Sequence, residues 1–123
     1  MGVKATTVEG RSLWVEADQE RGMVELKLGR SVVSFVGQKN LTDLTVLLSY
    51  GESAKGENGG KIAIDRSSRL YHVVFYDGER AVEECRMGAG EFKRFVARLA
   101  PDLVLARECG GISVACPVAD PAS

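Results

Sequence analysis

The sequence predicts an α+β protein in which an antiparallel β-meander is packed on one face by helices. Three observations lead to this prediction. Apolar and polar residues alternate along 61–65, as they do in strands with one buried face, and 70–76 is a β-prone run. An Asp-Gly pair at 77–78 lies between two β-prone runs, which is typical of a hairpin. Residues 92–99 have the apolar spacing of an amphipathic helix.

The N-terminal part of the chain contains further strand patterns. Residues 1–10 are expected to fray or to form an edge strand, and 11–16 and 23–28 alternate like strands joined by a polar turn. Residues 31–36 fit either a buried strand or the first turn of a helix. No internal repeat is apparent in the sequence.

Residues 40–50 fit a helix and a strand about equally well. We favour the helix because Asn40 can serve as its N-cap and Gly51 can end it. The glycine-rich segment 51–60 is expected to form a mobile loop.

The Asp77-Gly78 turn sets the expected register of the meander. It places Tyr76 opposite Glu79 and His72 opposite Glu83. One face then collects the core candidates Ile62, Ile64, Tyr71, Val73, Phe75 and Val82. The other face collects Lys61, Ala63, His72, Val74, Tyr76, Ala81 and Glu83, a mixture too apolar for plain solvent and too polar for a core.

The helix that follows should cover the aliphatic face of the meander. Its apolar stripe consists of Phe92, Phe95, Val96 and Leu99. Pro101 is expected to end it, and 103–107 and 112–116 are expected to be strands. We therefore predict one domain over residues 1–116 and a flexible tail over residues 117–123.

Composition narrows the class of protein. The net charge of −1 argues against a protein that coats duplex DNA indiscriminately. Asparagine and glutamine are scarce and arginine exceeds lysine, a balance that fits a thermophile. The three cysteines have no Cys-x-x-Cys spacing, which favours reduced thiols and a cytoplasmic location. No apolar run approaches the length of a membrane span.

The sequence contains no catalytic or metal-binding signature. His72 is the only histidine, and its expected contact with Glu83 lacks the third group that acid–base catalysis needs. Gly59-Gly60-Lys61 lacks the spacing and the hydroxyl residue of a phosphate loop. We predict a protein that is not an enzyme and that has no metal and no cofactor.

Binding of single-stranded nucleic acid is the function that the mixed face favours, because aromatic rings stack on bases while basic side chains contact phosphates. DNA is our first choice of ligand, with RNA left open. The residues expected to take part are Trp14, Lys61, Arg66, Arg69, His72, Tyr76, Arg80 and Arg86. The alternative is a non-enzymatic protein–protein interaction or oligomerisation module that uses the same face.

The order of strands and helix over residues 61–107, with Asp77-Gly78 followed by Glu91-Phe92-Lys93-Arg94-Phe95, resembles small single-strand DNA binders. It is similar to the archaeal ThermoDBP-related proteins, and also to Whirly and coactivator-type proteins. The ThermoDBP resemblance implies a homo-oligomer that holds single-stranded DNA in a cleft with aromatic and basic walls. A C-terminal leucine zipper is absent, so an oligomer is expected to form by edge pairing through 103–107 or 112–116.

Overall fold

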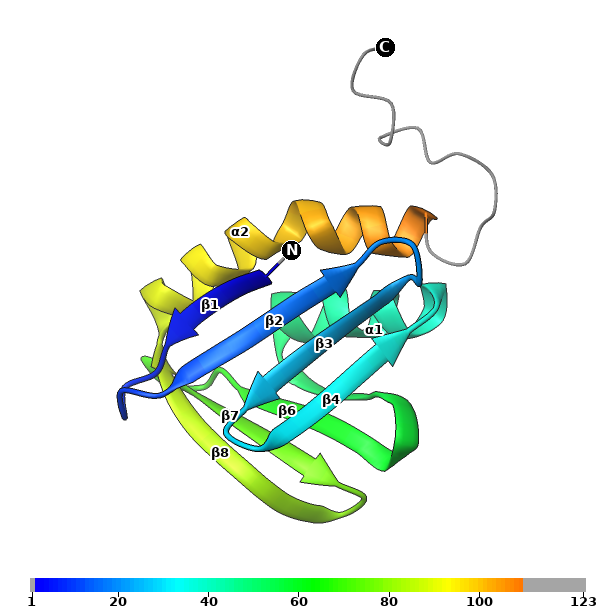
Figure 1. Cartoon of the computed structure of the whole chain (residues 1–123). Coiled ribbons are helices and arrows are strands. Elements are labelled where there is room, and N and C mark those ends of the chain that lie inside the picture. Colours follow the sequence, from blue (N-terminus) through cyan, green and yellow to red (C-terminus); the bar gives the residue numbers. More distant parts are fainter. Residues whose placement is uncertain (1, 110–123) are drawn as a thin grey trace.

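The computed structural model describes residues 2–109, which form two four-stranded antiparallel sheets and two long helices (Figure 1). The first half of the chain consists of β1 (Gly2–Thr6), β2 (Ser12–Asp18), β3 (Met23–Leu28), β4 (Ser31–Val36) and α1 (Gln38–Tyr50). The second half consists of β5 (Glu52–Lys55), the short 3-10 helix η1 (Glu57–Gly59), β6 (Gly60–Asp65), β7 (Leu70–Asp77), β8 (Arg80–Gly88) and α2 (Ala89–Cys109). The predicted α+β class, with a β-meander packed by helices, is confirmed.

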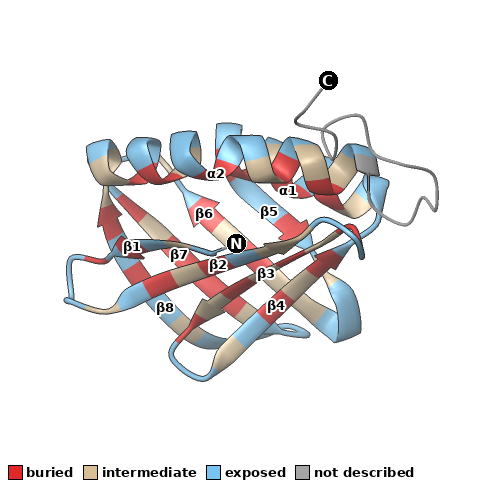
Figure 2. Cartoon of the chain, turned by 45° about the horizontal axis from the view of Figure 1, so that its top comes forward, coloured by how far each residue is buried: buried red, intermediate tan, exposed pale blue. Residues whose placement is uncertain are grey.

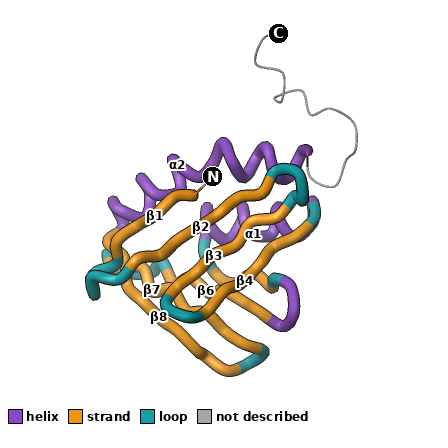
Figure 3. The backbone as a smooth tube through the Cα atoms, in the orientation of Figure 1, coloured by secondary structure: helices purple, strands orange, loops and turns teal. Residues whose placement is uncertain are grey.

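The two halves follow the same path, in which four consecutive strands form a meander and a helix follows (Figure 3). In each sheet the strands lie side by side in chain order. The repeat is one of topology, which explains why a search of the sequence for repeated residues does not find it.

One hydrophobic core joins both sheets and both helices. Buried residues alternate along the strands and gather on the side of each helix that faces the sheets (Figure 2). The helix α2 packs on β1, β2 and β3 and also on β7 and β8, while α1 packs on β4, β5 and β6. Each sheet therefore has an inner face directed at the core and an outer face directed at solvent.

The favoured assignment of the segment before Gly51 to a helix is confirmed, since α1 spans Gln38–Tyr50 and Gly51 ends it by donating its amide to the Leu47 carbonyl. Its N-cap prediction is wrong. Gly37 occupies the cap, and Asn40 instead donates its side-chain amide to the Lys55 carbonyl at 3.1 Å. Asn40 thus holds the edge strand β5 rather than its own helix.

The prediction of a loop over 51–60 is wrong, because Glu52–Lys55 pair with β6 and Glu57–Gly59 form η1. Only Ala54 of this strand is buried, so its alternation is too short to be recognised in the sequence. Gly56 passes directly beneath β4, where a Cβ atom would lie 2.4 Å from the Ser34 carbonyl oxygen. This contact brings the edge of the first sheet against the second.

The predicted register of the β7–β8 hairpin is wrong. The two-residue turn is Gly78-Glu79 rather than Asp77-Gly78, so Tyr76 lies opposite Ala81. A bulge between Phe75 and Tyr76 then shifts the pairing by one more residue. Beyond the bulge, each β8 side chain lies on the face of the sheet opposite to the predicted one. As a result Val82 is exposed instead of joining the core.

The remaining core residues predicted for this face are buried: Ile62, Ile64, Tyr71, Val73 and Phe75. Their cross-strand partners differ by two positions from the prediction, since Ile64 pairs with Val73. A shift of two residues preserves the face of each side chain, which is why the burial prediction survives the wrong register.

The helix α2 does not end at Pro101 but continues to Cys109, so the predicted strand over 103–107 is wrong. The apolar stripe simply extends by two more turns, because Leu103 and Ala106 are buried like Leu99. Burial of these side chains offsets a helix-interior proline penalty of about 3 kcal/mol. The predicted strand over 112–116 and the tail over 117–123 lie outside the described residues.

Side chains and loops cover backbone groups at the sheet edges. Arg98 of α2 donates to the Lys4 carbonyl on β1 at 2.9 Å, and the Val8 amide donates to the Arg86 carbonyl on β8 at 2.7 Å. Each contact occupies one backbone carbonyl that a second chain could use for edge pairing. The expected oligomer contact through 103–107 is also lost, because that segment is helical.

Candidate nucleic-acid interface

The outer face of the second sheet carries a row of side chains in which two lysines are followed by a tyrosine. Lys55 pairs with Lys61, Lys61 with Tyr76, and Tyr76 with Ala81, across the four strands β5 to β8. We call these four residues the tyrosine row. The Lys61 Nζ atom lies 4.4 Å from the centre of the Tyr76 ring, a cation–π contact that places charge beside a partly exposed aromatic surface.

A hollow of about 460 Å³ opens beside the tyrosine row, and we call it the glycine hollow. It is lined by Lys55, Gly56, Gly59, Gly60, Lys61, Gly78 and Glu79. The Gly78 amide donates to the Gly59 carbonyl at 2.7 Å, which joins η1 to the β7–β8 turn. Both of these glycines have positive φ, 79° and 63°, so the backbone here needs glycine.

The chemistry of the glycine hollow suits an anion. Glycines leave the backbone open to a ligand, and two lysines supply charge that suits a phosphate. Within residues 2–109 neither Lys55 nor Lys61 forms an ion pair, so their charge is not neutralised by a nearby carboxylate. Glu79 is the one acidic residue in the lining.

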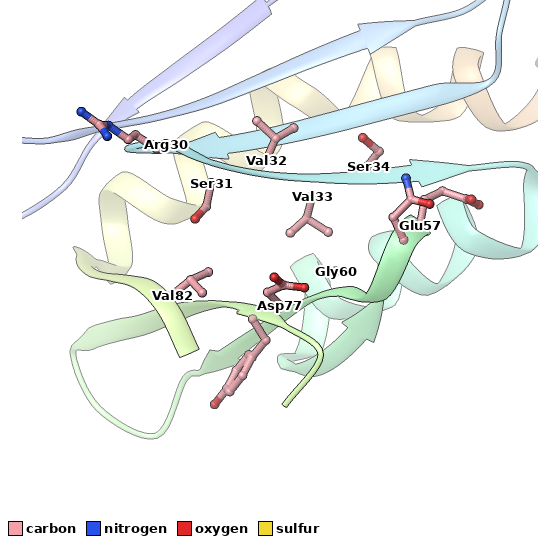
Figure 4. Close-up of a pocket in the computed structure, with 11 residues that line it drawn as sticks. Arg30, Ser31, Val32, Val33, Ser34, Glu57, Gly60, Asp77 and Val82 are labelled. Atoms are coloured by element: carbon pink, nitrogen blue, oxygen red, sulfur yellow. The ribbon is translucent and has the colours of Figure 1, made fainter. Parts of the chain in front are cut away.

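A second hollow of about 350 Å³ lies between β4 and the β7–β8 hairpin (Figure 4). Valines from both sheets face it, among them Val33 and Val82, and Glu57 and Asp77 add carboxylates. We call it the acidic hollow. Arg30 and Tyr76 also line it, so the ring of the tyrosine row borders this hollow.

The basic side chains at the other end of the outer face have acidic partners. Arg86 Nε lies 3.0 Å from Glu9 Oε2, and His72 Nε2 lies 3.4 Å from Glu84 Oε2. Hydrogen bonds from the backbone N–H of Arg86, and then from its side chain, lower the pKa of Glu9 to about 2 despite its partial desolvation. The expected contact of His72 with Glu83 is absent, because the bulge moves Glu83 to Arg11.

Two of the predicted arginines lie away from the tyrosine row, and a third lies next to it. Arg66 packs over the Tyr71 ring at 5.0 Å and donates to the Ser49 carbonyl, so it holds the end of α1. Arg69 lies in the β6–β7 connection, where its carbonyl accepts the Ala89 amide at 3.0 Å. Arg80 is exposed in the first pair after the β7–β8 turn, next to the tyrosine row in sequence.

Trp14 belongs to the first sheet and not to the face that carries Tyr76. The structure therefore brings together Lys61, Tyr76 and, further along the same face, His72 and Arg86. It does not bring together all eight residues that the sequence suggested.

Sequence reasoning missed Lys55 and the glycines at 56, 59 and 78. The loop predicted over 51–60 concealed the strand that places Lys55 beside Lys61. The clustering of glycine around a lysine pair was a usable signal, but a phosphate-loop spacing test rejects it because the glycines come from two separate turns.

Other chemistry finds little support in residues 2–109. No group of three histidine, cysteine or acidic side chains in this part could hold a metal ion. Burial raises the pKa of the Cys85 thiol to about 11, which makes it a poor nucleophile at neutral pH. Neither helix within these residues is long and apolar enough to cross a membrane.

Comparisons with known proteins give no family for this chain: no family model, no curated protein and no solved structure matches it.

Proposed function

We propose that this protein binds single-stranded DNA without sequence preference, through the tyrosine row and the glycine hollow. The observation that carries the proposal is the contact of Tyr76 with Lys61, which lines the glycine hollow together with Lys55. A base stacks on the exposed ring while the adjoining phosphate enters the hollow. The binder has no chemistry of its own.

The energetics favour exchange of Lys61 for a base on the Tyr76 ring. An exposed cation–π contact contributes about 0.5–1 kcal/mol, whereas stacking of a base on an aromatic side chain contributes about 1–3 kcal/mol. Lys61 gains a new partner when it turns to the phosphate, because its own side chain lines the glycine hollow. The free energy contributed by base stacking therefore exceeds the free energy lost with the cation–π contact.

The position of the charges gives the bound strand a path. Lys55 and Lys61 lie on β5 and β6, whereas the acidic hollow lies beneath β4 on the other side of the hairpin. We infer that the phosphates follow the lysine side and that the bases face Tyr76. Arg80 extends the basic margin beyond the turn, while Arg86 adds less because Glu9 is paired with it.

Fluorescence anisotropy of a labelled mixed-sequence oligonucleotide tests the proposal. The expected result is binding of the single strand in preference to the duplex, with affinity that falls as salt rises. Equal binding of both forms would replace stacking by general charge attraction. No binding at low salt would reject the proposal.

Protein–protein interaction is the second candidate, and one observation favours it. Val46 and Tyr50 lie one turn apart on α1 and are 50% and 79% exposed. The face first expected to serve such a contact is less apolar than its sequence suggests, because Val74 is buried there. Sedimentation analysis of the wild type and of Tyr50→Ser tests this candidate: an assembly that the substitution disperses would support it.

A further inference from the structure

The outer face of the first sheet repeats the pattern of the tyrosine row. Lys4 pairs with Trp14, Trp14 with Lys27, and Lys27 with Val32, across β1 to β4. We call these four residues the tryptophan row. Each row thus contains one large aromatic residue and two lysines, and each ends with a small aliphatic residue on its last strand.

The two rows occupy equivalent positions in the two halves of the fold. Lys27–Val32 and Tyr76–Ala81 are both the second pair from a two-residue turn, and each turn begins with a glycine of positive φ. At the opposite end of the first sheet, the Asp18–Met23 pair lies four residues from the tryptophan row along each strand. In the second sheet, the Asp65–His72 pair lies four residues from the tyrosine row in the same way. The aromatic residue and a lysine have exchanged strands, but the chemistry of the row is the same.

Trp14 is partly exposed, and its indole lies against the backbone of β1. A Cβ atom on Gly2 would lie 2.6 Å from Trp14 Cζ2, so the indole rests on bare backbone. The Trp14 Nε1 atom donates to Glu16 Oε1 at 2.9 Å, which fixes the orientation of the ring. A ring that is already oriented loses little freedom when a base stacks on it.

The charges beside the tryptophan row differ on its two sides. Glu16 and Glu25 form the next row toward the β2–β3 turn, whereas Thr6 and Ser12 form the row on the other side. Among residues 2–109, no carboxylate forms an ion pair with Lys4 or Lys27. A phosphate chain is therefore repelled from the glutamates and is accommodated along the hydroxyl side.

We propose that the tryptophan row is a second, independent surface for single-stranded DNA, so that one chain holds two segments of strand on opposite sides of its core. This inference rests on the proposed function. It follows from the matching row chemistry and from the inner faces of the two sheets, which share one core and so direct the outer faces apart. The two rows come near each other at one end, where Val32 and Tyr76 both line the acidic hollow.

Trp14 is the only tryptophan, so its fluorescence reports on this surface alone. The experiment titrates an oligothymidine of about six nucleotides, near the short end of the site sizes of single-strand binders, into the wild type and into Tyr76→Ala. Anisotropy of the labelled oligonucleotide is recorded in parallel, and native mass spectrometry counts the oligonucleotides bound per chain.

The expected result is quenching of Trp14 in both proteins with midpoints within about twofold of each other, because separate sites act additively. The wild type binds two oligonucleotides per chain and Tyr76→Ala binds one tightly. Lys27→Met weakens the quenching several-fold, whereas Lys39→Met, which removes an exposed lysine of α1 from outside both rows, leaves it unchanged. Should Tyr76→Ala fail to fold, Lys55→Met with Lys61→Met disables the tyrosine row instead.

Two outcomes overturn the second surface while leaving the proposed function intact. One is binding by anisotropy with one oligonucleotide per chain and unchanged Trp14 emission. The other is quenching that disappears in Tyr76→Ala, which would mean one continuous site. Absence of any binding by the wild type rejects the proposed function itself and the second surface with it.

Discussion

Replacement of Tyr76 by alanine separates stacking from charge attraction in the tyrosine row. The substitution removes about 1–3 kcal/mol of stacking from the complex, but it also removes a cation–π contact of about 0.5–1 kcal/mol from the free protein. At the midpoints of these ranges the net loss is about 1.25 kcal/mol, or roughly eightfold in affinity. Tyr76→Phe keeps the ring and should bind almost as tightly as the wild type.

Lys61→Met gives the complementary result. It should lower the slope of log affinity against log salt concentration by about 0.7, the value for one phosphate contact on a single strand, whereas Tyr76→Ala should leave this slope unchanged. Lys93→Met is the matched control, because Lys93 is an exposed lysine on α2. Anisotropy titrations at several salt concentrations measure both quantities. Equal affinity of the wild type and Tyr76→Ala would refute the stacking role of this residue.

Three further predictions concern stability. Phe92→Ala should lower the free energy of unfolding by about 3–5 kcal/mol in urea titrations, because Phe92 is 1% exposed in the core. Gly56→Ala should cost about 1–3 kcal/mol by forcing a Cβ atom against a β4 carbonyl, whereas Gly88→Ala, with open space around it, should leave the melting temperature unchanged. The pKa of Glu9 is lowered from 4.5 to about 2 by Arg86, so its stabilising effect is present above pH 4.5 and is lost as the pH falls toward 2. Glu9→Gln should therefore melt below the wild type at neutral pH, and a constant difference down to pH 2 would contradict this linkage.

The sequence predicted burial better than it predicted pairing. The alternation along β6 identified Ile62 as a core residue, the expected pairing with β7 added Val73 and Phe75, and all three are buried. Alternation has a period of two, so it determines which face a side chain occupies but not which residue lies opposite. The hairpin register depended on the turn, and the turn lies one residue later than expected.

Only the tertiary structure decided the end of α2 and the existence of β5. Pro101 is a local signal to stop a helix, but the burial of Leu103 and Ala106 against the core outweighs it. The strand β5 has a single buried residue, Ala54, and is defined by its hydrogen bonds to β6. Neither effect is visible in a local window of sequence, because both depend on distant partners.

The sequence by itself determined the α+β class, most of the core face and the chemical types of residue that could meet a nucleic acid. It could not determine which of these residues share a surface. In the fold, Lys55 and the glycine of the β7–β8 turn lie at the tyrosine row. Arg66 lies instead at the end of α1, and Trp14 lies on the other sheet. The physical reason is that side-chain pattern follows local periodicity, whereas a binding surface is formed where separate strands pair and two sheets pack.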